Sequence, residues 1–195
     1  VTEIIQIPDS IITSRYYGYK LSYIAADTLK PRYGYWVKSK SEGQLILSAS
    51  LLSNLKSSIR DDFSGWNCLK ITDNYNNEQT LYFSSHGTVR SIDLYDLPPL
   101  PPDGLFDVRF GSQRNIEMLP NNISPKISLP IDIQSNSNSL KVEWNINDDD
   151  LIYSLMLSGE KTITLSGNGF KNIEHLTSNI SLQIDSNNPV VPLSF

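Results

Sequence analysis

The chain has 195 residues, of which 39% are hydrophobic and 10% aromatic, and it carries a formal net charge of -5. This composition is typical of a folded globular protein rich in extended strands and excludes a disordered tail. The acidic balance argues against nucleic acid or an anionic membrane as the main partner, since both select basic surfaces, and no stretch has the apolar length of a membrane span.

The first half of the chain predicts short β-strands separated by turns. Leu69 and Ile71 alternate with Lys70 and Thr72, the period of a half-buried strand, and residues 73–77 supply a hairpin turn. Leucines and an isoleucine recur at helical spacing at 50–59, so a short helix there remains an alternative to strand or loop. Runs of β-branched and aromatic residues predict strands at 3–7, 19–24, 33–38, 44–48, 67–72 and 80–84.

Four prolines, at positions 98, 99, 101 and 102, interrupt the strand pattern near the middle of the chain. Proline fixes its own φ, lacks a backbone donor and pushes the preceding residue toward extended conformations, so the segment has no place in a central strand. We therefore expect a domain junction there. The predicted organisation is an N-terminal β domain at 1–96, a proline-rich hinge at 97–104 and a second domain at 105–195.

The second half continues the strand pattern. Phe106, Val108 and Phe110 share one face of a strand whose other face carries Asp107 and Arg109. About seven short strands are typical of an immunoglobulin-like sandwich, here with Trp144 as a core anchor and without the cysteine pair. The predicted fold is thus all-β, with two β-sandwich-like domains joined by the hinge and the second immunoglobulin-like. Further strands are predicted at 127–133, 139–146, 151–157, 161–165 and 180–184.

Three stretches, taken in order, resemble a known family. They are GYWVK at 34–38, LKITDNYNNEQTLYF at 69–83 and LPPLPPDGLFDVRF at 97–110. The set resembles the C-terminal β modules that precede the type IX secretion sorting domain in large secreted proteins of Bacteroidota and Ignavibacteria, although Arg32 stands where that family often has Gly. The resemblance covers most of the chain, carries no catalytic residues, and implies an extracellular or cell-surface location.

No arrangement of side chains predicts catalysis. His86 and His175 stand at no metal-ligand spacing, and neither a nucleophile elbow nor a phosphate loop occurs. Cys68, the single cysteine, is expected as a small buried residue. The acidic turns at 145–150 and 73–78 are the best calcium candidates, but they lack the EF-hand order and read as solvated turns. We predict no enzyme, no cofactor and no metal; a hydrolase is the least favoured alternative.

Several residues of the first half are candidates for surface contacts. Tyr33, Tyr35 and Trp36 are possible ligand or interface aromatics, and adjacent strand residues point to opposite faces, so one of Tyr35 and Trp36 should pack inward. Ser10 and Thr28 are possible glycosylation sites because their surroundings resemble the Asp-Ser/Thr-apolar acceptor pattern of Bacteroidota. Sequons of the N-x-S type occur at 122–124 and 179–181.

These observations favour a non-catalytic extracellular protein. The leading hypothesis is a structural, spacer or assembly module of a secreted or cell-surface protein, including a subunit of a surface appendage, whose strand edges pair with protein neighbours. The alternative is a carbohydrate-binding or adhesion module attached to an upstream enzyme. Expected partners are neighbouring protein chains, copies of itself included, and glycans.

Overall fold

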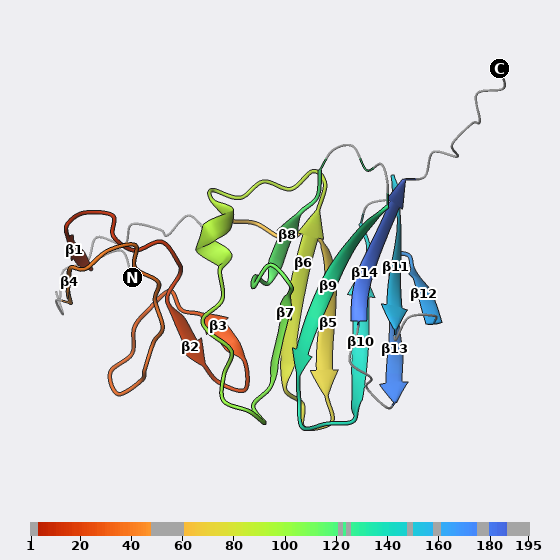
Figure 1. Ribbon diagram of the computed structural model, residues 1–195, viewed down its shortest axis with the longest axis horizontal. Helices are drawn as coiled ribbons and strands as arrows, with labels where there is room; N and C mark the ends of the chain where they lie inside the picture. Colours follow the sequence, from red (N-terminus) through yellow and green to blue (C-terminus); the bar gives the residue numbers. More distant parts are fainter. Residues whose placement is uncertain are drawn as a thin grey trace, which may run out of the picture.

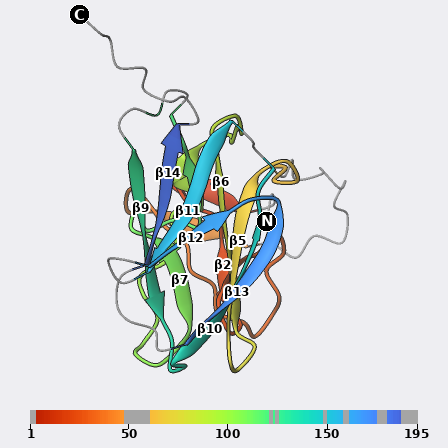
Figure 2. The ribbon, with the colours of Figure 1, turned by 90° about the vertical axis from the view of Figure 1, so that its right-hand side faces the viewer.

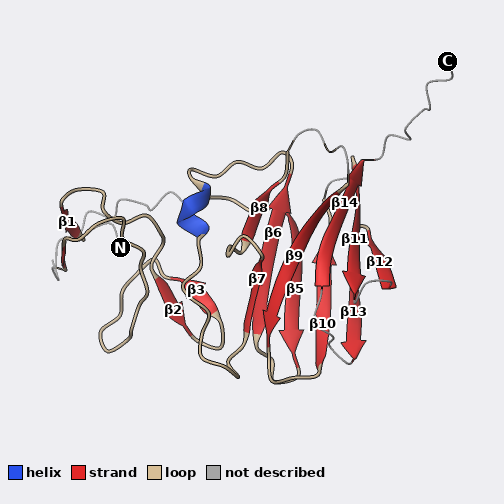
Figure 3. Ribbon diagram, viewed as in Figure 1, coloured by secondary structure: helices blue, strands red, loops and turns tan. Residues whose placement is uncertain are grey.

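The computed structural model describes residues 4–47, 61–120, 123, 126–147, 150–157, 161–174 and 180–186. Two five-stranded sheets face each other in a sandwich, and residues 4–47, which we call the lobe, lie beside it (Figure 1). Strands dominate the sandwich, whereas the lobe is mostly loop (Figure 3). The expected all-β class is confirmed.

The sandwich consists of two layers, and each layer is one sheet. Figure 2 shows both layers from the side of β12 and β13. Sheet 1 has the order β13-β10-β5-β6-β8 and sheet 2 the order β12-β11-β14-β9-β7. All neighbours are antiparallel except β6 and β8. The strands of sheet 1 are β5 (Asn67–Asp73), β6 (Glu78–Ser84), β8 (Ile116–Met118), β10 (Ser139–Asn145) and β13 (Asn168–Glu174). Those of sheet 2 are β7 (Asp107–Phe110), β9 (Ile127–Gln134), β11 (Leu151–Leu157), β12 (Lys161–Leu165) and β14 (Ile180–Ser186).

The lobe is built from two small antiparallel sheets. One pairs β1 (Ile5–Ile7) with β4 (Gln44–Ile46), and the other pairs β2 (Tyr17–Tyr19) with β3 (Tyr23–Ala25). A 3-10 turn, η1 (Ile92–Tyr95), lies between the lobe and the sandwich (Figure 3).

The main core lies between the two sheets, where the alternate side chains of each strand meet. Leu69 and Ile71 of β5 are buried, as their alternation predicts, and Phe83 of β6 packs on Tyr153 of β11 with 5.4 Å between ring centroids. Each such side chain contributes about 1.5 to 3 kcal/mol when it leaves water. Leu155 completes the contact from sheet 2.

The sandwich takes strands from both sides of the prolines, so the predicted boundary between residues 96 and 97 is wrong. The β5–β6 hairpin pairs with β10, with Leu69 opposite Trp144 and Ile71 opposite Val142. A two-stranded hairpin cannot cover its own apolar face, and here the hairpin becomes part of a larger sheet whose inner face packs on sheet 2. Among the described residues before the prolines, the strands of the lobe form sheets separate from the sandwich, whereas β5 and β6 belong to it.

Two further local predictions differ from the structure, two strands were missed, and one prediction is not tested. The strand expected at 19–24 is a hairpin that turns at Leu21, where φ is 70°. At 33–38, only Trp36 makes a bridge, to Tyr17. Strands β8 and β13 were not expected. The helix considered at 50–59 lies outside the described residues.

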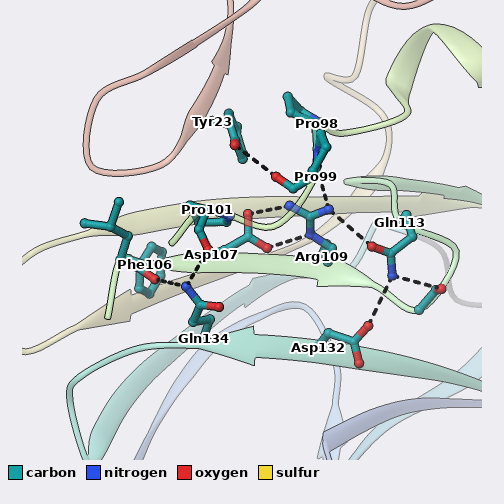
Figure 4. A network of polar contacts seen from close by, with 12 residues as sticks. Tyr23, Pro98, Pro99, Pro101, Phe106, Asp107, Arg109, Gln113, Asp132 and Gln134 are labelled. Atoms are coloured by element: carbon teal, nitrogen blue, oxygen red, sulfur yellow. Dashed lines mark hydrogen bonds and ion pairs between the residues drawn. The ribbon is translucent and has the colours of Figure 1, made fainter. Parts of the chain in front are cut away.

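The proline segment is fastened along its length and does not act as a free hinge. We call residues 97–105 the proline strap. Proline has no backbone N–H to donate to a sheet, but its carbonyl oxygen still needs a hydrogen-bond donor. Side chains around the strap donate hydrogen bonds to these proline carbonyls (Figure 4). Gln134 Nε2 donates to the carbonyls of Pro101, Pro102 and Leu105 at 3.2, 2.9 and 2.8 Å.

The centre of the strap rests on a buried ion pair in β7. Asp107 and Arg109 are 3% and 1% exposed, and two hydrogen bonds of 2.6 and 2.8 Å join the carboxylate to the guanidinium. Arg109 Nη1 also donates to Pro98 O at 2.8 Å and to Gln113 Oε1 at 3.2 Å (Figure 4). The two residues do lie on the strand face opposite the core, as predicted, but the strap covers that face.

Replacing Arg109 by Met should lower the free energy of unfolding by about 3 to 5 kcal/mol, because it leaves the Asp107 carboxylate buried without a partner. The double variant Asp107→Leu/Arg109→Met should lose less, since it leaves no buried charge behind. Urea unfolding followed by tryptophan fluorescence measures both, with exposed Lys20→Met as the matched control. A single variant no worse than the control would show that the pair does not hold the strap.

Candidate functional site

The lobe is fixed to the sandwich through residues 93–99. Tyr17 Oη and the backbone N–H of Arg15 both donate to Leu94 O, at 3.4 and 3.2 Å. The guanidinium of Arg15 lies over the Tyr95 ring, 5.3 Å from its centroid. Burial raises the pKa of Tyr17 to about 12.

Two more tyrosines of the β2–β3 hairpin reach the strap and its continuation. Tyr23 Oη donates to Pro99 O at 3.0 Å, and Tyr19 Oη donates to Phe106 O at 3.1 Å. Their rings meet edge to face with centroids 5.2 Å apart. Tyr17, Tyr23 and Leu97 form the small apolar cluster at this junction. The lobe therefore holds one orientation relative to the sandwich.

The Asp96 carboxylate completes the junction because it accepts hydrogen bonds from both the lobe and the sandwich. Lys38 Nζ of the lobe lies 2.6 Å from Asp96 Oδ2, and Arg114 Nε of the sandwich lies 2.7 Å from Oδ1. Burial by itself raises the pKa of the Asp96 carboxyl, but the hydrogen bonds from Lys38 and Arg114 outweigh burial and lower it overall.

The lobe carries most of the exposed apolar surface. Of fourteen exposed large apolar side chains among the described residues, eight lie in the lobe. Ile5 and Ile46 stand opposite each other on β1 and β4 and are 54% and 42% exposed. Concentrated apolar surface of this kind marks contact sites in soluble proteins, so we take the lobe surface as the candidate functional site. The eight are Ile5, Ile7, Leu21, Ile24, Tyr33, Trp36, Ile46 and Leu47.

The three candidate aromatics take different positions on the lobe. Tyr33 and Trp36 are 71% and 52% exposed. Tyr35 is half-buried, its ring lies against Gly18, and its hydroxyl accepts from the backbone N–H of Lys30 at 2.9 Å. Tyr33 and Trp36 are thus the two of the three that a ligand can reach.

The two candidate glycosylation residues are both exposed on the lobe. Ser10 lies in a turn with φ of 57°, and Thr28 lies in a bend. Asn122, Ser124 and Asn179, which belong to the N-x-S sequons, lie outside the described residues.

The acidic turn after β5 is closed by its own hydrogen bonds. Asp73 Oδ1 accepts from the backbone N–H groups of Tyr75 and Asn77 at 2.8 and 2.9 Å. Its Oδ2 accepts from Asn77 Nδ2 and Ser135 Oγ at 2.9 and 3.2 Å. Both oxygens of the buried carboxylate are therefore engaged in holding the hairpin turn.

The remaining chemical candidates are scattered. Cys68 was expected to be buried in the core, but it is half-buried and lies on the outer side of β5. Its partial burial raises the pKa of the thiol. His86 Nε2 lies 3.7 Å from Asp150 Oδ2, both side chains being exposed, while His175 lies outside the described residues. Within the described ranges, no group of three or more His, Cys, Asp or Glu could hold a metal ion.

Sequence reasoning missed the isoleucines of β1 and β4 and the junction carboxylate Asp96. Alternating apolar residues usually mark a buried strand face. The sequence therefore has no signal that the isoleucines of β1 and β4 are exposed in the described structure. A search for charge separation along the chain would have found that residues 4–47 are basic and the remainder acidic. Over the described residues, no helix has the length and apolar character needed to cross a membrane.

Asp96→Asn should weaken the junction and change how stability depends on pH. Because the folded-state pKa lies below the unfolded value of about 3.9, the carboxylate contributes stability above that value and loses it as the pH falls through the folded pKa. The variant should be less stable by roughly 1 kcal/mol at neutral pH, and its stability should fall less than that of the wild type on acidification. Thermal unfolding from about pH 7 to about pH 2 checks this. Asp9→Asn, at an exposed position in the turn before Ile11, is the control and should change neither property.

Comparison with known proteins assigns no family: no protein-family model, curated protein or solved structure matches the chain.

Proposed function

We propose that the chain is a non-catalytic structural module of a secreted or cell-surface protein, which serves as a rigid spacer and assembly unit. The observation that carries the proposal is the set of contacts that joins the lobe to the sandwich. Hydrogen bonds from Tyr17, Tyr19 and Tyr23 and the Lys38–Asp96 ion pair join the two parts across the strap. A spacer needs this property, because a flexible junction transmits neither distance nor direction.

The placement of buried charge supports a structural role. The buried charged side chains of the described residues are Asp73, Asp107 and Arg109. Asp73 holds the β5–β6 turn, and the other two hold the strap. Their hydrogen bonds go to backbone groups, to each other and to the neighbouring side chains of Asn77, Ser135 and Gln113, as a stabilising use of buried charge requires.

The exposed apolar surface of the lobe supports a role in contacts with other macromolecules. Exposed apolar side chains concentrate on the lobe, at one end of the molecule (Figure 1). The resemblance of the GYWVK, QTLYF and FDVRF stretches to modules of secreted proteins supports an extracellular location. Ser10 and Thr28 are exposed and accessible to modifying enzymes.

Protease treatment of intact source cells tests the location and use of the module. Peptides of this chain should be released before those of cytoplasmic marker proteins, because a surface module faces the medium. Electron microscopy of the native material should show filaments or particles of constant length, and intact-mass measurement should show added sugar if Ser10 or Thr28 is modified. Recovery only from the cytoplasmic fraction would refute the proposed function.

Carbohydrate binding is the second candidate, favoured by the exposure of Tyr33 and Trp36. Exposed aromatic faces stack on sugar rings, so the double variant Tyr33→Ala/Trp36→Ala should lose any glycan-array signal of the wild type. Tyr75→Ala is the matched control, because Tyr75 is 67% exposed but lies in the β5–β6 turn. A wild type without array signal, or a double variant that keeps it, would exclude these aromatics as a sugar platform.

A further inference from the structure

The edge strands of the two sheets differ in how well they are protected. An edge strand has one row of backbone N–H and C=O groups without a neighbour, and an unprotected row pairs readily with a strand of another chain. On the lobe side, β7 has four residues, all buried, beside the strap, and β8 has three, of which Ile116 packs against Trp66 and Tyr95. The edges at the end far from the lobe are β12 and β13 (Figure 1).

Strand β13 carries a protective charge that β12 lacks. Lys171 alternates with buried Ile173, so it stands on the inner side of β13 opposite Val142, yet it is exposed at the edge. An inward-facing charge of this kind blocks a further strand, because pairing would bury it. Strand β12 has no charged residue from Thr162 to Leu165 and pairs with β11 on one side only. Among the described residues, no backbone hydrogen bond joins its other side to any segment.

The side chains of β12 suit a further strand. Thr162 and Thr164 are exposed on the outer side of sheet 2, whereas Ile163 faces inward, is half-buried and packs against the main core. Trp144 is half-buried at the same end of the core, and its indole N–H donates to Ser166 O at 3.3 Å, just beyond β12. Covering this edge would therefore remove apolar surface from water as well as pair the open backbone.

The strand is complementary to itself when two copies run antiparallel. With Ile163 of one copy opposite Ile163 of the other, Thr162 stands opposite Thr164 and Thr164 opposite Thr162. Threonine pairs are favourable across antiparallel strands. The register sets no two charged residues opposite each other, because position 161 meets position 165. Each copy thus offers the other the partner strand that its open edge lacks.

We propose that β12 pairs with β12 of a second copy, so that the two five-stranded copies of sheet 2 continue as one sheet. Both copies use the same surface, so the arrangement is a two-fold one that closes at the dimer. It places the lobes at the two outer ends, because β12 lies at the end of the molecule opposite β1 and β4 (Figure 1). This inference rests on the proposed assembly role and deepens it: the dimer is a spacer of double length with a contact surface at each end.

The proposed contact is small and uncharged, and both properties have measurable consequences. Interfaces well below the usual size belong to weak, transient complexes, so a dissociation constant between roughly 1 μM and 1 mM is expected. Salt should leave the wild-type association unchanged, because no charged pair of residues faces another across the two strands.

Charges placed at the two threonines test the register. Thr162→Lys/Thr164→Lys and Thr162→Glu/Thr164→Glu each set two like-charged pairs across the contact, so either variant alone should dimerise at least about tenfold more weakly than the wild type. The two variants mixed should form a heterodimer at low salt, because each charge then meets its opposite. Sedimentation velocity up to about 1 mM chain measures these dissociation constants. Both positions are exposed, and thermal unfolding checks that each variant remains folded.

Thr28→Lys/Thr88→Lys is the matched control, because it adds the same charge at two exposed threonines that do not lie on sheet 2; it should dimerise like the wild type. A Thr162→Lys/Thr164→Lys variant that dimerises like the wild type would overturn the proposal. A mixture that stays monomeric would also overturn it, as would a wild type that is monomeric at about 1 mM.

Hydrogen exchange names the other occupant if the wild type is monomeric. Slow exchange at residues 162–165 would then assign the cover of β12 to another part of the same chain, and fast exchange would leave the edge to a strand of a different protein. Protease treatment of intact cells reads out the proposed function independently of these results.

Discussion

The arrangement of this molecule depends on the buried Asp107–Arg109 pair beneath the proline strap. Residues 97–105 cannot pair as a strand because four of them are prolines, yet they must cross from the lobe junction to β7. Arg109 resolves the conflict by donating both to Asp107 and to Pro98 O. A guanidinium suits this position because its donors are fixed in a plane and bind a carboxylate with two bonds while a further donor reaches a carbonyl.

The strap in turn places the lobe. Once Pro98 and Pro99 are fixed, the carbonyl that Tyr23 needs is in position, and Asp96 lies between Lys38 and Arg114. Individual bonds of this kind are each worth about 1 kcal/mol, but several that share one short segment restrain it together. A proline segment that the sequence predicts as a hinge between domains is thus fastened to both the lobe and the sandwich.

The same constraint explains why the lobe can present apolar surface without losing its position. The tyrosine contacts hold the lobe through β2 and β3, whereas Ile5, Ile7 and Ile46 of β1 and β4 are exposed. A surface held rigidly before binding loses little conformational entropy when a partner docks. The separation of a basic lobe from an acidic sandwich adds direction to such an encounter.

The sequence by itself determined the all-β class, most strands of the sandwich and the face on which Asp107 and Arg109 stand, because side-chain alternation along a strand is a local property. Only the tertiary structure decided the pairing of β5 with β10 across the prolines, because hydrogen bonds between distant strands leave no mark on either one. It also created β13, whose Gly169 is poor in strand preference but leaves room for the Trp144 indole against its backbone. Whether a given face meets water was likewise decided by packing. Alternation placed Arg109 on the strand face opposite the core, and long-range contacts with the strap buried that face.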